Sequence, residues 1–153
     1  MRTLILCVSI HHKNTEKIAN AIGEVLRANF AKPEDVDASL LSNCELIGFG
    51  SGIYFGRHHR SLFSFIDKLP HMNKKAFIFS TSGLGLMPLD HLLLKRKLIE
   101  KGFNIIGEFS CRGFNTHGPL KYIGGMNKGK PDDRDLERAR EFAIRLKNTG
   151  ITL

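Results

Sequence analysis

Short apolar runs alternate along this chain with longer segments of helical periodicity. Thr3–Ser9, Leu46–Ser51 and Ala76–Ser82 lack the polar alternation of half-exposed strands, which is typical of strands covered on both faces. Between them, Thr15–Phe30 and Arg57–Leu69 place apolar residues three and four positions apart, which predicts two amphipathic helices. Strands that alternate with helices predict right-handed crossovers and a parallel sheet with helices on both faces.

The remaining segments continue the same alternation. Leu89–Lys101 is expected to form a helix that ends at Gly102, Phe103–Cys111 to form a strand, and a last helix to begin near Pro131. A proline and three acidic residues interrupt Lys32–Leu41, where a second strand would fall, so we expect that strand to be short or at a sheet edge. Without an internal repeat or linker, residues 1–153 are expected to form one domain.

Cysteine content and hydropathy restrict the class of protein. Cys7, Cys44 and Cys111 are odd in number and far apart, which argues against a disulfide framework or a zinc site and favours a reducing cytoplasm. The longest uncharged stretch, Ala76–Leu89, is too short for the roughly 20 residues of a membrane span. The apolar run at the N-terminus is followed by no cleavage pattern, so we expect no signal peptide.

The charge balance is strongly basic. The chain has 23 Lys and Arg against 15 Asp and Glu, which gives a net charge of +8. Such an excess favours acidic partners, whether proteins, nucleic acids or anionic cofactors. The positive charge forms no recognisable nucleic-acid-binding motif, and we therefore expect no nucleic-acid partner.

The segment after the first predicted strand, Ser9–Thr15, has the composition of an anion site. It leads directly into a helix, where backbone amides and the side chains of Ser9, Asn14 and Thr15 can donate hydrogen bonds and Lys13 can add charge. Simple helix capping by Asn14 or Thr15 is the alternative. The chain has neither a GxxxxGK[ST] nor a GxGxxG motif, which argues against a Walker loop and against nicotinamide bound in the Rossmann manner.

Three further strands are followed by small, glycine-rich loops. These are Gly50–Gly56, which includes two aromatic residues, Ser80–Gly85, and Cys111–Asn115. In open parallel sheets, ligands bind in the crevice beyond the carboxyl ends of the strands, so the loops are expected to lie together. An anion site beside aromatic surface suits a planar ring that carries a phosphate.

On these residues the chain resembles flavodoxins and flavodoxin-like flavoproteins over nearly its whole length. The resemblance is carried by Ser9–Thr15 with the following Glu16-Lys17-Ile18-Ala19, by Gly50–Gly56 and by Ser80–Gly83. It implies an α/β fold, a three-layer α/β/α flavodoxin-like sandwich whose five-stranded parallel sheet has the order 2-1-3-4-5. It also implies FMN as the cofactor, with the phosphate at the first loop and the isoalloxazine ring between the next two.

The resemblance places Tyr54 against the ring and the Ser82-Gly83 turn near its pyrimidine side. In the family the first loop is typically Ser/Thr-x-Thr-Gly-Asn-Thr; here Lys13 replaces the glycine and one residue is added, so His11 or His12 can contact the phosphate in place of a threonine. The residues implied to bind the cofactor are Ser9, His11, His12, Lys13, Asn14, Thr15, Ser51, Gly52, Ile53, Tyr54, Phe55, Gly56, Thr81, Ser82, Gly83, Cys111, Arg112 and Gly113.

The function implied is electron transfer through FMN to an acidic redox partner protein, without a catalytic residue of the chain itself. One alternative is an FMN-dependent quinone or NAD(P)H oxidoreductase, in which Phe114, Tyr122 or Met126 lines a pocket over the ring. Another is an interaction module that binds no flavin. The histidines show no metal-binding spacing, and no GxSxG nucleophile motif is present, so we expect neither a metal site nor a hydrolase.

Two basic segments have open interpretations. Arg57 and Arg60 either lie near the flavin and favour its reduced anionic form, or belong to a solvated helix face. Lys121–Lys130 contains several glycines and is either a lid or docking loop or a plain exposed connection.

Overall fold

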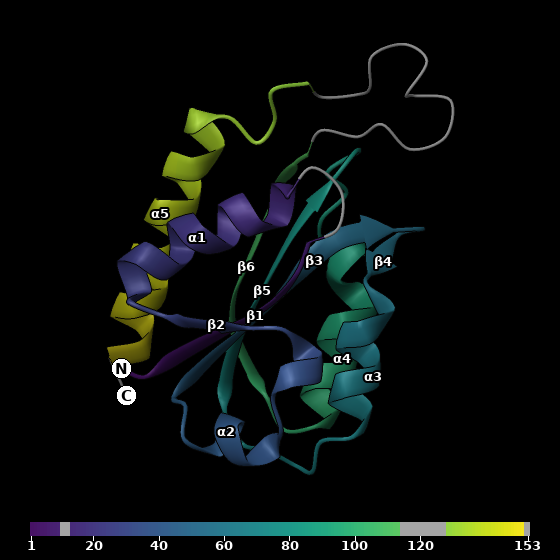
Figure 1. The fold of residues 1–153 in the computed structure, drawn as a ribbon, viewed down its shortest axis with the longest axis vertical. Coiled ribbons are helices and arrows are strands. Elements are labelled where there is room, and N and C mark those ends of the chain that lie inside the picture. Colours follow the sequence, from purple (N-terminus) through teal and green to yellow (C-terminus); the bar gives the residue numbers. More distant parts are fainter. Residues whose placement is uncertain (10–12, 114–127, 152–153) are drawn as a thin grey trace.

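A sheet lies between two layers of helices in the computed structural model, which describes residues 1–9, 13–113 and 128–151 (Figure 1). The elements are β1 (Thr3–Val8), α1 (Asn14–Leu26), β2 (Asn29–Ala31), η1 (Pro33–Asp35), α2 (Ala38–Ser42), β3 (Leu46–Tyr54), β4 (Arg57–His58), α3 (Arg60–Asp67), β5 (Lys75–Ser82), η2 (Leu89–His91), α4 (Leu92–Glu100), β6 (Asn104–Arg112) and α5 (Asp133–Ile151). In this part of the chain no helix is long and apolar enough to cross a membrane.

The sheet has the predicted parallel arrangement. Its five parallel strands lie in the order β2-β1-β3-β5-β6, which is the predicted order 2-1-3-4-5 once the short β4 is left out. Strand β4 is an addition that the sequence analysis missed; it pairs antiparallel with the end of β3. The predicted fold class is therefore confirmed.

The second strand is short and lies at the sheet edge, as expected, but its predicted position was wrong. Strand β2 occupies Asn29–Ala31, and the segment expected to hold it contains η1 and α2 instead. Pro33 begins η1, and the Asp37 carboxylate accepts a hydrogen bond from the Leu40 amide at 3.0 Å, which caps α2. Helix α1 ends at Leu26, before its predicted end, because Arg27 is left-handed (φ 52°) and its amide bonds to the Gly23 carbonyl.

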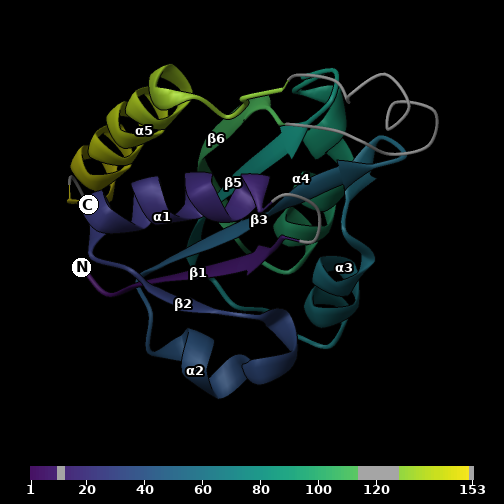
Figure 2. The same cartoon turned by 45° about the horizontal axis from the view of Figure 1, so that its top comes forward.

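Two apolar layers bury the two faces of the sheet. On one face, α1 and α5 cover β-strand residues such as Ile5, Phe77 and Phe109, with Ile22 and Phe142 among the helical contacts. The other face packs against α3 and α4. Figure 2 shows the two helix pairs on opposite sides of the sheet. Continuous apolar strands are thus explained by burial on both faces.

Glycines on β3 allow large rings to cross its surface from β5. A Cβ atom at Gly48 would lie 2.3 Å from the Phe77 ring, and one at Gly50 would lie 2.2 Å from the Phe79 ring. Both rings are fully buried. The pairing of glycine with phenylalanine on neighbouring strands therefore reflects packing: each ring fills the space that a glycine leaves.

A β-hairpin extends the end of β3 beyond the sheet. Tyr54 pairs with Arg57, and the two residues between them, Phe55 (φ 52°) and Gly56 (φ 78°), are both left-handed, as in a type I′ turn. The predicted helix start at Arg57 was therefore wrong: Arg57 and His58 form β4, and α3 begins at Arg60. The His59 ring accepts a hydrogen bond from the Ser61 amide at 3.1 Å and caps the helix.

Candidate functional site

The carboxyl ends of four strands meet at one edge of the sheet. In the register of the parallel pairs, Val8 lies beside Ser51, Gly52 beside Thr81, and Ser82 beside Arg112. Each strand end leads into one of the loops that the sequence analysis selected. The strand ends from which these loops leave therefore lie together, as expected.

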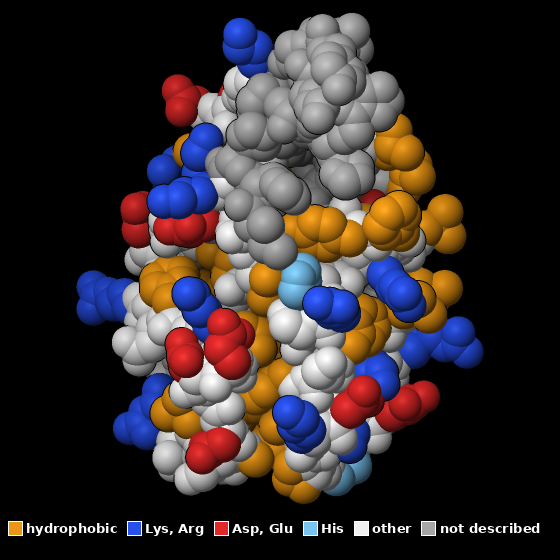
Figure 3. Space-filling view, turned by 45° about the vertical axis from the view of Figure 1, so that its right-hand side comes forward, with side chains coloured by type: hydrophobic (Ala, Val, Ile, Leu, Met, Phe, Trp, Pro, Cys, Tyr) orange, Lys and Arg blue, Asp and Glu red, His pale blue; other side chains and the backbone are white. Residues whose placement is uncertain are grey.

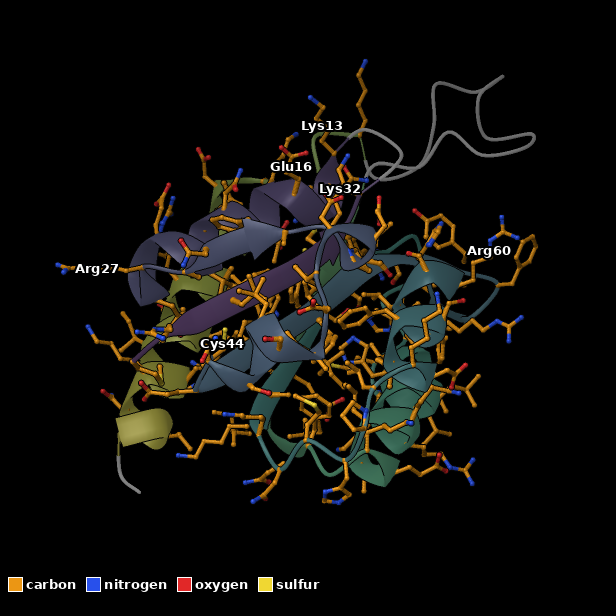
Figure 4. All side chains as sticks on the ribbon, turned by 60° about the horizontal axis from the view of Figure 1, so that its bottom comes forward. Lys13, Glu16, Arg27, Lys32, Cys44 and Arg60 are labelled. Atoms are coloured by element: carbon orange, nitrogen blue, oxygen red, sulfur yellow. The ribbon has the colours of Figure 1, made fainter. Side chains whose placement is uncertain are left out.

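The first loop enters the N-terminus of α1 through a left-handed lysine. Lys13 is the residue before the helix and has φ 52° and ψ 31°. The Ser9 hydroxyl accepts a hydrogen bond from the Glu16 amide at 3.3 Å, which ties the loop to the first helical turn. In Figure 4 the Lys13 side chain extends outward from the helix start, on the same side as that of Glu16. Both His11 and His12 lie outside the described residues.

A buried hydroxyl pair joins the first loop to the third. The Thr15 and Thr81 Oγ1 atoms are 2.8 Å apart, and the two residues are only 2% and 4% exposed. At the next strand, a Cβ atom on Gly113 would lie 2.7 Å from Asn14 Nδ2, so the helix start is also packed against the end of β6. These contacts fix the start of α1 relative to the sheet edge.

The second loop is the β3–β4 hairpin, and the predicted site residues on it differ in burial and in their hydrogen bonds. Ser51 is fully buried: its hydroxyl accepts from the His59 amide at 2.9 Å and donates to the Gly52 carbonyl at 2.6 Å, so it holds the hairpin. Tyr54 is half-buried and packs edge-on against the His59 ring at 5.5 Å. Burial raises the pKa of the Tyr54 phenol, with the nearby Cys7 as a second cause.

The other predicted residues of the hairpin range from half-buried to fully exposed. Tyr54 lies over Gly52, since a Cβ at Gly52 would be 3.1 Å from the phenol oxygen. Ile53 pairs with His58 and is half-buried, whereas Phe55 at the turn is 97% exposed beside Gly56. Of the hairpin residues, Tyr54 therefore has the placement that suits contact with a planar ring, and its phenol covers Gly52.

The third and fourth loops are joined through Ser82. Its hydroxyl accepts a hydrogen bond from the Gly85 amide at 2.6 Å, and its carbonyl accepts one from the Gly113 amide at 3.1 Å. Gly83 lies inside this turn. Cys111 is buried, and burial, followed by the charge of Asp135, raises the pKa of its thiol to about 12. Only the backbone of Cys111 is therefore suited to polar contact at the rim.

Arg112 is exposed and borders a cavity of about 330 Å³ beside the start of α5. Lys130 and Arg138 also line it, but both interact with Asp135, at 3.2 and 3.6 Å. Much of the positive charge around this cavity is thus already paired.

The sequence analysis missed a buried histidine pair behind the hairpin. The His58 and His91 rings lie 5.0 Å apart, and His58 Nε2 is 3.0 Å from the Phe79 carbonyl oxygen. His91 lies between Ser80 Oγ at 2.7 Å and Glu108 Oε1 at 3.1 Å. This geometry fits a neutral ring that donates from Nδ1 to the carboxylate and accepts from the serine hydroxyl.

Burial sets the protonation of both rings. It lowers the pKa of His58 to about 3, with the neighbouring His91 as a second cause. It also lowers the pKa of His91, although the hydrogen bond to Glu108 opposes this shift. Ser80, His91 and Glu108 have the order of a catalytic triad, but Ser80 and His91 are fully buried, so the group holds β5, β6 and η2 together. The sequence gives no signal of the contact between His58 and His91, because the two residues are far apart along the chain.

The donor set at the helix start suits a phosphate. The N-terminus of α1, the hydroxyls of Ser9, Thr15 and Thr81 and the positive charge of Lys13 lie together there, although the Glu16 amide already donates to Ser9. Gly52 and half-buried Tyr54 add an uncharged surface at the neighbouring strand end. The arrangement can hold a molecule with an anionic tail and a flat ring. Within the described residues, no three His, Cys, Asp or Glu side chains form a potential metal site.

The fold places the chain in a known structural class, that of the flavodoxins. It matches the structure of a flavodoxin from the domain Archaea with a TM-score of 0.73 and 18% identity, over 98% of this chain and 99% of the other. It also matches oxidised Flavodoxin 2 from Bacillus cereus with a TM-score of 0.72 and 20% identity, over 97% and 99% of the two chains. These likenesses concern the fold.

The sequence itself belongs to the flavodoxin-domain family. The family described as "Flavodoxin domain" matches residues 5–91, more than half of the chain, and this range includes the loops after β1, β3 and β5. An uncharacterized protein of Methanocaldococcus jannaschii is 52% identical over 144 residues, which are 94% of this chain and 96% of that protein. The resemblance noted in the sequence is thereby confirmed.

Proposed function

We propose that this protein binds FMN at the edge formed by the ends of β1, β3, β5 and β6 and passes electrons to a redox partner. The observation that carries the proposal is the start of α1, where Lys13 supplies charge and Thr15 is held at 2.8 Å by Thr81. When bound, FMN supplies the one- and two-electron chemistry, while the protein supplies binding, orientation and electrostatics.

The phosphate is proposed to lie at the first loop. If Thr81 donates to Thr15 Oγ1, the Thr15 proton remains to be donated to a phosphate oxygen, and the first-turn amides and Lys13 add further attraction. Ser9 holds the loop through the Glu16 amide. The helix N-terminus contributes a partial positive charge at the same point.

The ring is proposed to lie between the hairpin and the Ser82-Gly83 turn. Tyr54 offers an aromatic face, and Ser82 keeps the turn in shape through its bond to Gly85. The net charge of +8 favours an acidic protein as the redox partner. Three free cysteines suit a reducing compartment, and we propose the cytoplasm.

The phosphate assignment is tested by comparing ligands. Thr15→Ala, alone or with Asn14→Ala, should weaken FMN binding about tenfold or more, because a hydrogen bond to a charged group contributes roughly 1.5–3 kcal/mol, and should affect riboflavin little. Thr15→Ser is the matched control, since it keeps the hydroxyl that pairs with Thr81 and should keep the affinity for FMN. Titrations followed by absorbance would contradict the proposal if Thr15→Ala weakened both ligands equally.

The alternative of an FMN-dependent quinone or NAD(P)H oxidoreductase depends on residues outside the described part of the chain. Phe114, Tyr122 and Met126, which would line the substrate pocket, lie there, as does most of the segment proposed as a lid. Steady-state oxidation of NAD(P)H with a quinone by the FMN-loaded protein separates the two functions. A pure carrier gives no turnover in this assay.

A further inference from the structure

Exposed large hydrophobic side chains are concentrated on two segments at the sheet edge. Phe55 is 97% exposed at the hairpin turn, and six more such residues follow β5 between Leu84 and Leu93. Together they form what we call the leucine surface: Phe55, Leu84, Leu86, Met87, Leu89, Leu92 and Leu93. Single exposed hydrophobic residues are ordinary, but clusters of this kind mark interaction surfaces.

The two segments are joined beneath the surface. Strand β4 packs against η2 and α4, and the His58 and His91 rings meet at 5.0 Å between them. His91 is in turn held by Ser80 and Glu108. The hairpin and the start of α4 therefore present their exposed side chains from one supported base.

Positive charge lies directly behind the apolar residues on both segments. On α4, Leu92 and Leu93 form the first turn, and the exposed Arg96 follows one turn later, about 5 Å along the axis, whereas Lys95 is paired with Glu108 at 2.9 Å. On the hairpin, Arg57 follows the turn. Arg60, at the start of α3, is exposed as well (Figure 4). Figure 3 shows the same layering, with hydrophobic side chains at the upper right and Lys and Arg side chains below them.

We propose that the leucine surface docks on a membrane that contains anionic lipids. Its apolar side chains enter the boundary between headgroups and acyl chains, and the cations one turn behind them meet the lipid phosphates. This layering matches the roughly 5–10 Å to which interfacial segments are buried. The proposal goes beyond FMN binding, because Leu86, Met87, Leu89, Leu92 and Leu93 lie outside the loops proposed to hold the cofactor.

Composition and charge favour a lipid membrane over a protein partner or a second copy of the chain as the occupant of the leucine surface. Leucine, which makes up five of the seven residues, is under-represented among the energetic centres of protein interfaces but common on membrane-binding faces. A second copy of the chain would bring another net charge of +8 against the same cations. Anionic lipids attract these cations and the positive end of α4.

The absence of tryptophan from the sequence makes a direct test possible. Leu89→Trp places a single indole on the leucine surface, where Leu89 is 68% exposed, and Ile144→Trp is the control on α5, where Ile144 is 50% exposed. With vesicles of phosphatidylcholine and phosphatidylglycerol in a 70:30 ratio (roughly one anionic lipid in three, so that the cations are engaged), Leu89→Trp should show a blue-shifted emission and Ile144→Trp none. Pure phosphatidylcholine should bind more weakly.

Cosedimentation with the same vesicles tests the side chains without a reporter. The Leu89→Ser and Leu92→Ser pair should lower the bound-to-free ratio about tenfold or more, whereas Ile144→Ser should leave it unchanged. Thermal unfolding checks that these exposed variants remain folded. No binding of the original protein to the anionic vesicles, or equal binding of the serine pair, would overturn the proposal.

Two other outcomes would also overturn it. A dimer in sedimentation equilibrium that the serine pair dissociates would make a second copy the occupant. Binding of an acidic ferredoxin through Leu89 and Leu92, without vesicle binding, would make an acidic protein the occupant of the leucine surface. Because vesicle binding is measured on protein with and without FMN, its failure is distinct from a failure of flavin binding.

Discussion

At the scale of single residues, Lys13 combines backbone geometry with charge. The family motif has glycine at this point, and Lys13 adopts the left-handed conformation that glycine accepts without penalty (φ 52°). For a residue with a side chain this conformation costs roughly 1–2 kcal/mol. A function for the ammonium group at the helix start would explain why the chain tolerates that cost.

Lys13→Gly separates the two contributions. The backbone keeps its shape, so the free energy of unfolding should rise by about 1 kcal/mol as strain is relieved. Affinity for FMN should fall about fivefold, because an exposed charge near an anion contributes roughly 1 kcal/mol, while riboflavin affinity should not change. Chemical denaturation and ligand titration measure the two effects. Lys17→Ala, on the exposed side of α1, is the control, and equal losses for both ligands would exclude a phosphate contact by Lys13.

At the scale of elements, the parallel strands were predictable and the hairpin was not. Apolar runs covered on both faces identify β1, β3 and β5 because each is long enough to exclude polar alternation. Strand β4 has two residues and therefore no period. Its position depends on the His58 ring, which bonds to the Phe79 carbonyl 21 residues away. Such a contact exists only once β3 and β5 are in register.

For the candidate site, the position at the strand ends was predictable from the sequence and the side-chain contacts were not. The rule that ligands bind beyond the carboxyl ends of parallel strands was enough to select the loops that hold Thr15, Thr81 and Gly113. It could not reveal that the Thr15 and Thr81 hydroxyls meet, or that Ser51 uses its hydroxyl to hold the hairpin. Those roles depend on side-chain direction across neighbouring strands, which spacing along one strand does not report.

The buried histidines give the hairpin and η2 a predictable response to pH. In the unfolded chain each ring takes up a proton near pH 6.5, whereas the folded state keeps His58 neutral down to about pH 3 and lowers the pKa of His91 as well. Between these limits the unfolded state binds more protons. The free energy of unfolding should therefore fall as pH decreases from 6.5, by at most about 1.4 kcal/mol per pH unit for each histidine.

His58→Gln tests this dependence, since glutamine can still donate to the Phe79 carbonyl but does not titrate. Urea unfolding at several pH values should give a smaller slope for this variant between pH 6.5 and 4 than for the original protein. Asn20→Gln, at an exposed position on α1 without a titratable group, should keep the original slope. If His58→Gln kept it too, the buried ring would not be the group that titrates.

At the scale of the whole molecule, the positive charge should act on the potential of the proposed cofactor. A cation about 7 Å from a reduced, anionic flavin is worth roughly 2 kcal/mol at an effective dielectric constant of 20, and about 2.3 kcal/mol corresponds to 100 mV. With a net charge of +8, the protein should therefore have a less negative potential than an acidic flavodoxin.

Arg57→Ala and Arg60→Ala should each move the midpoint potential to more negative values by tens of millivolts in a redox titration of the FMN-loaded protein, less at high ionic strength. Arg145→Ala, at an exposed position on α5, should have a smaller effect. Midpoints that are the same for all three variants would show that Arg57 and Arg60 belong to a solvated face only.

The three cysteine thiols of the protein are kept in their protonated form. Burial raises the pKa of Cys44 as well as those of Cys7 and Cys111, the latter two to about 12. Almost no thiolate is then present at neutral pH, and thiolate is the form that reacts with alkylating agents and with hydrogen peroxide. Peroxide released when a reduced flavin meets oxygen would therefore find few reactive thiols in the protein that produced it.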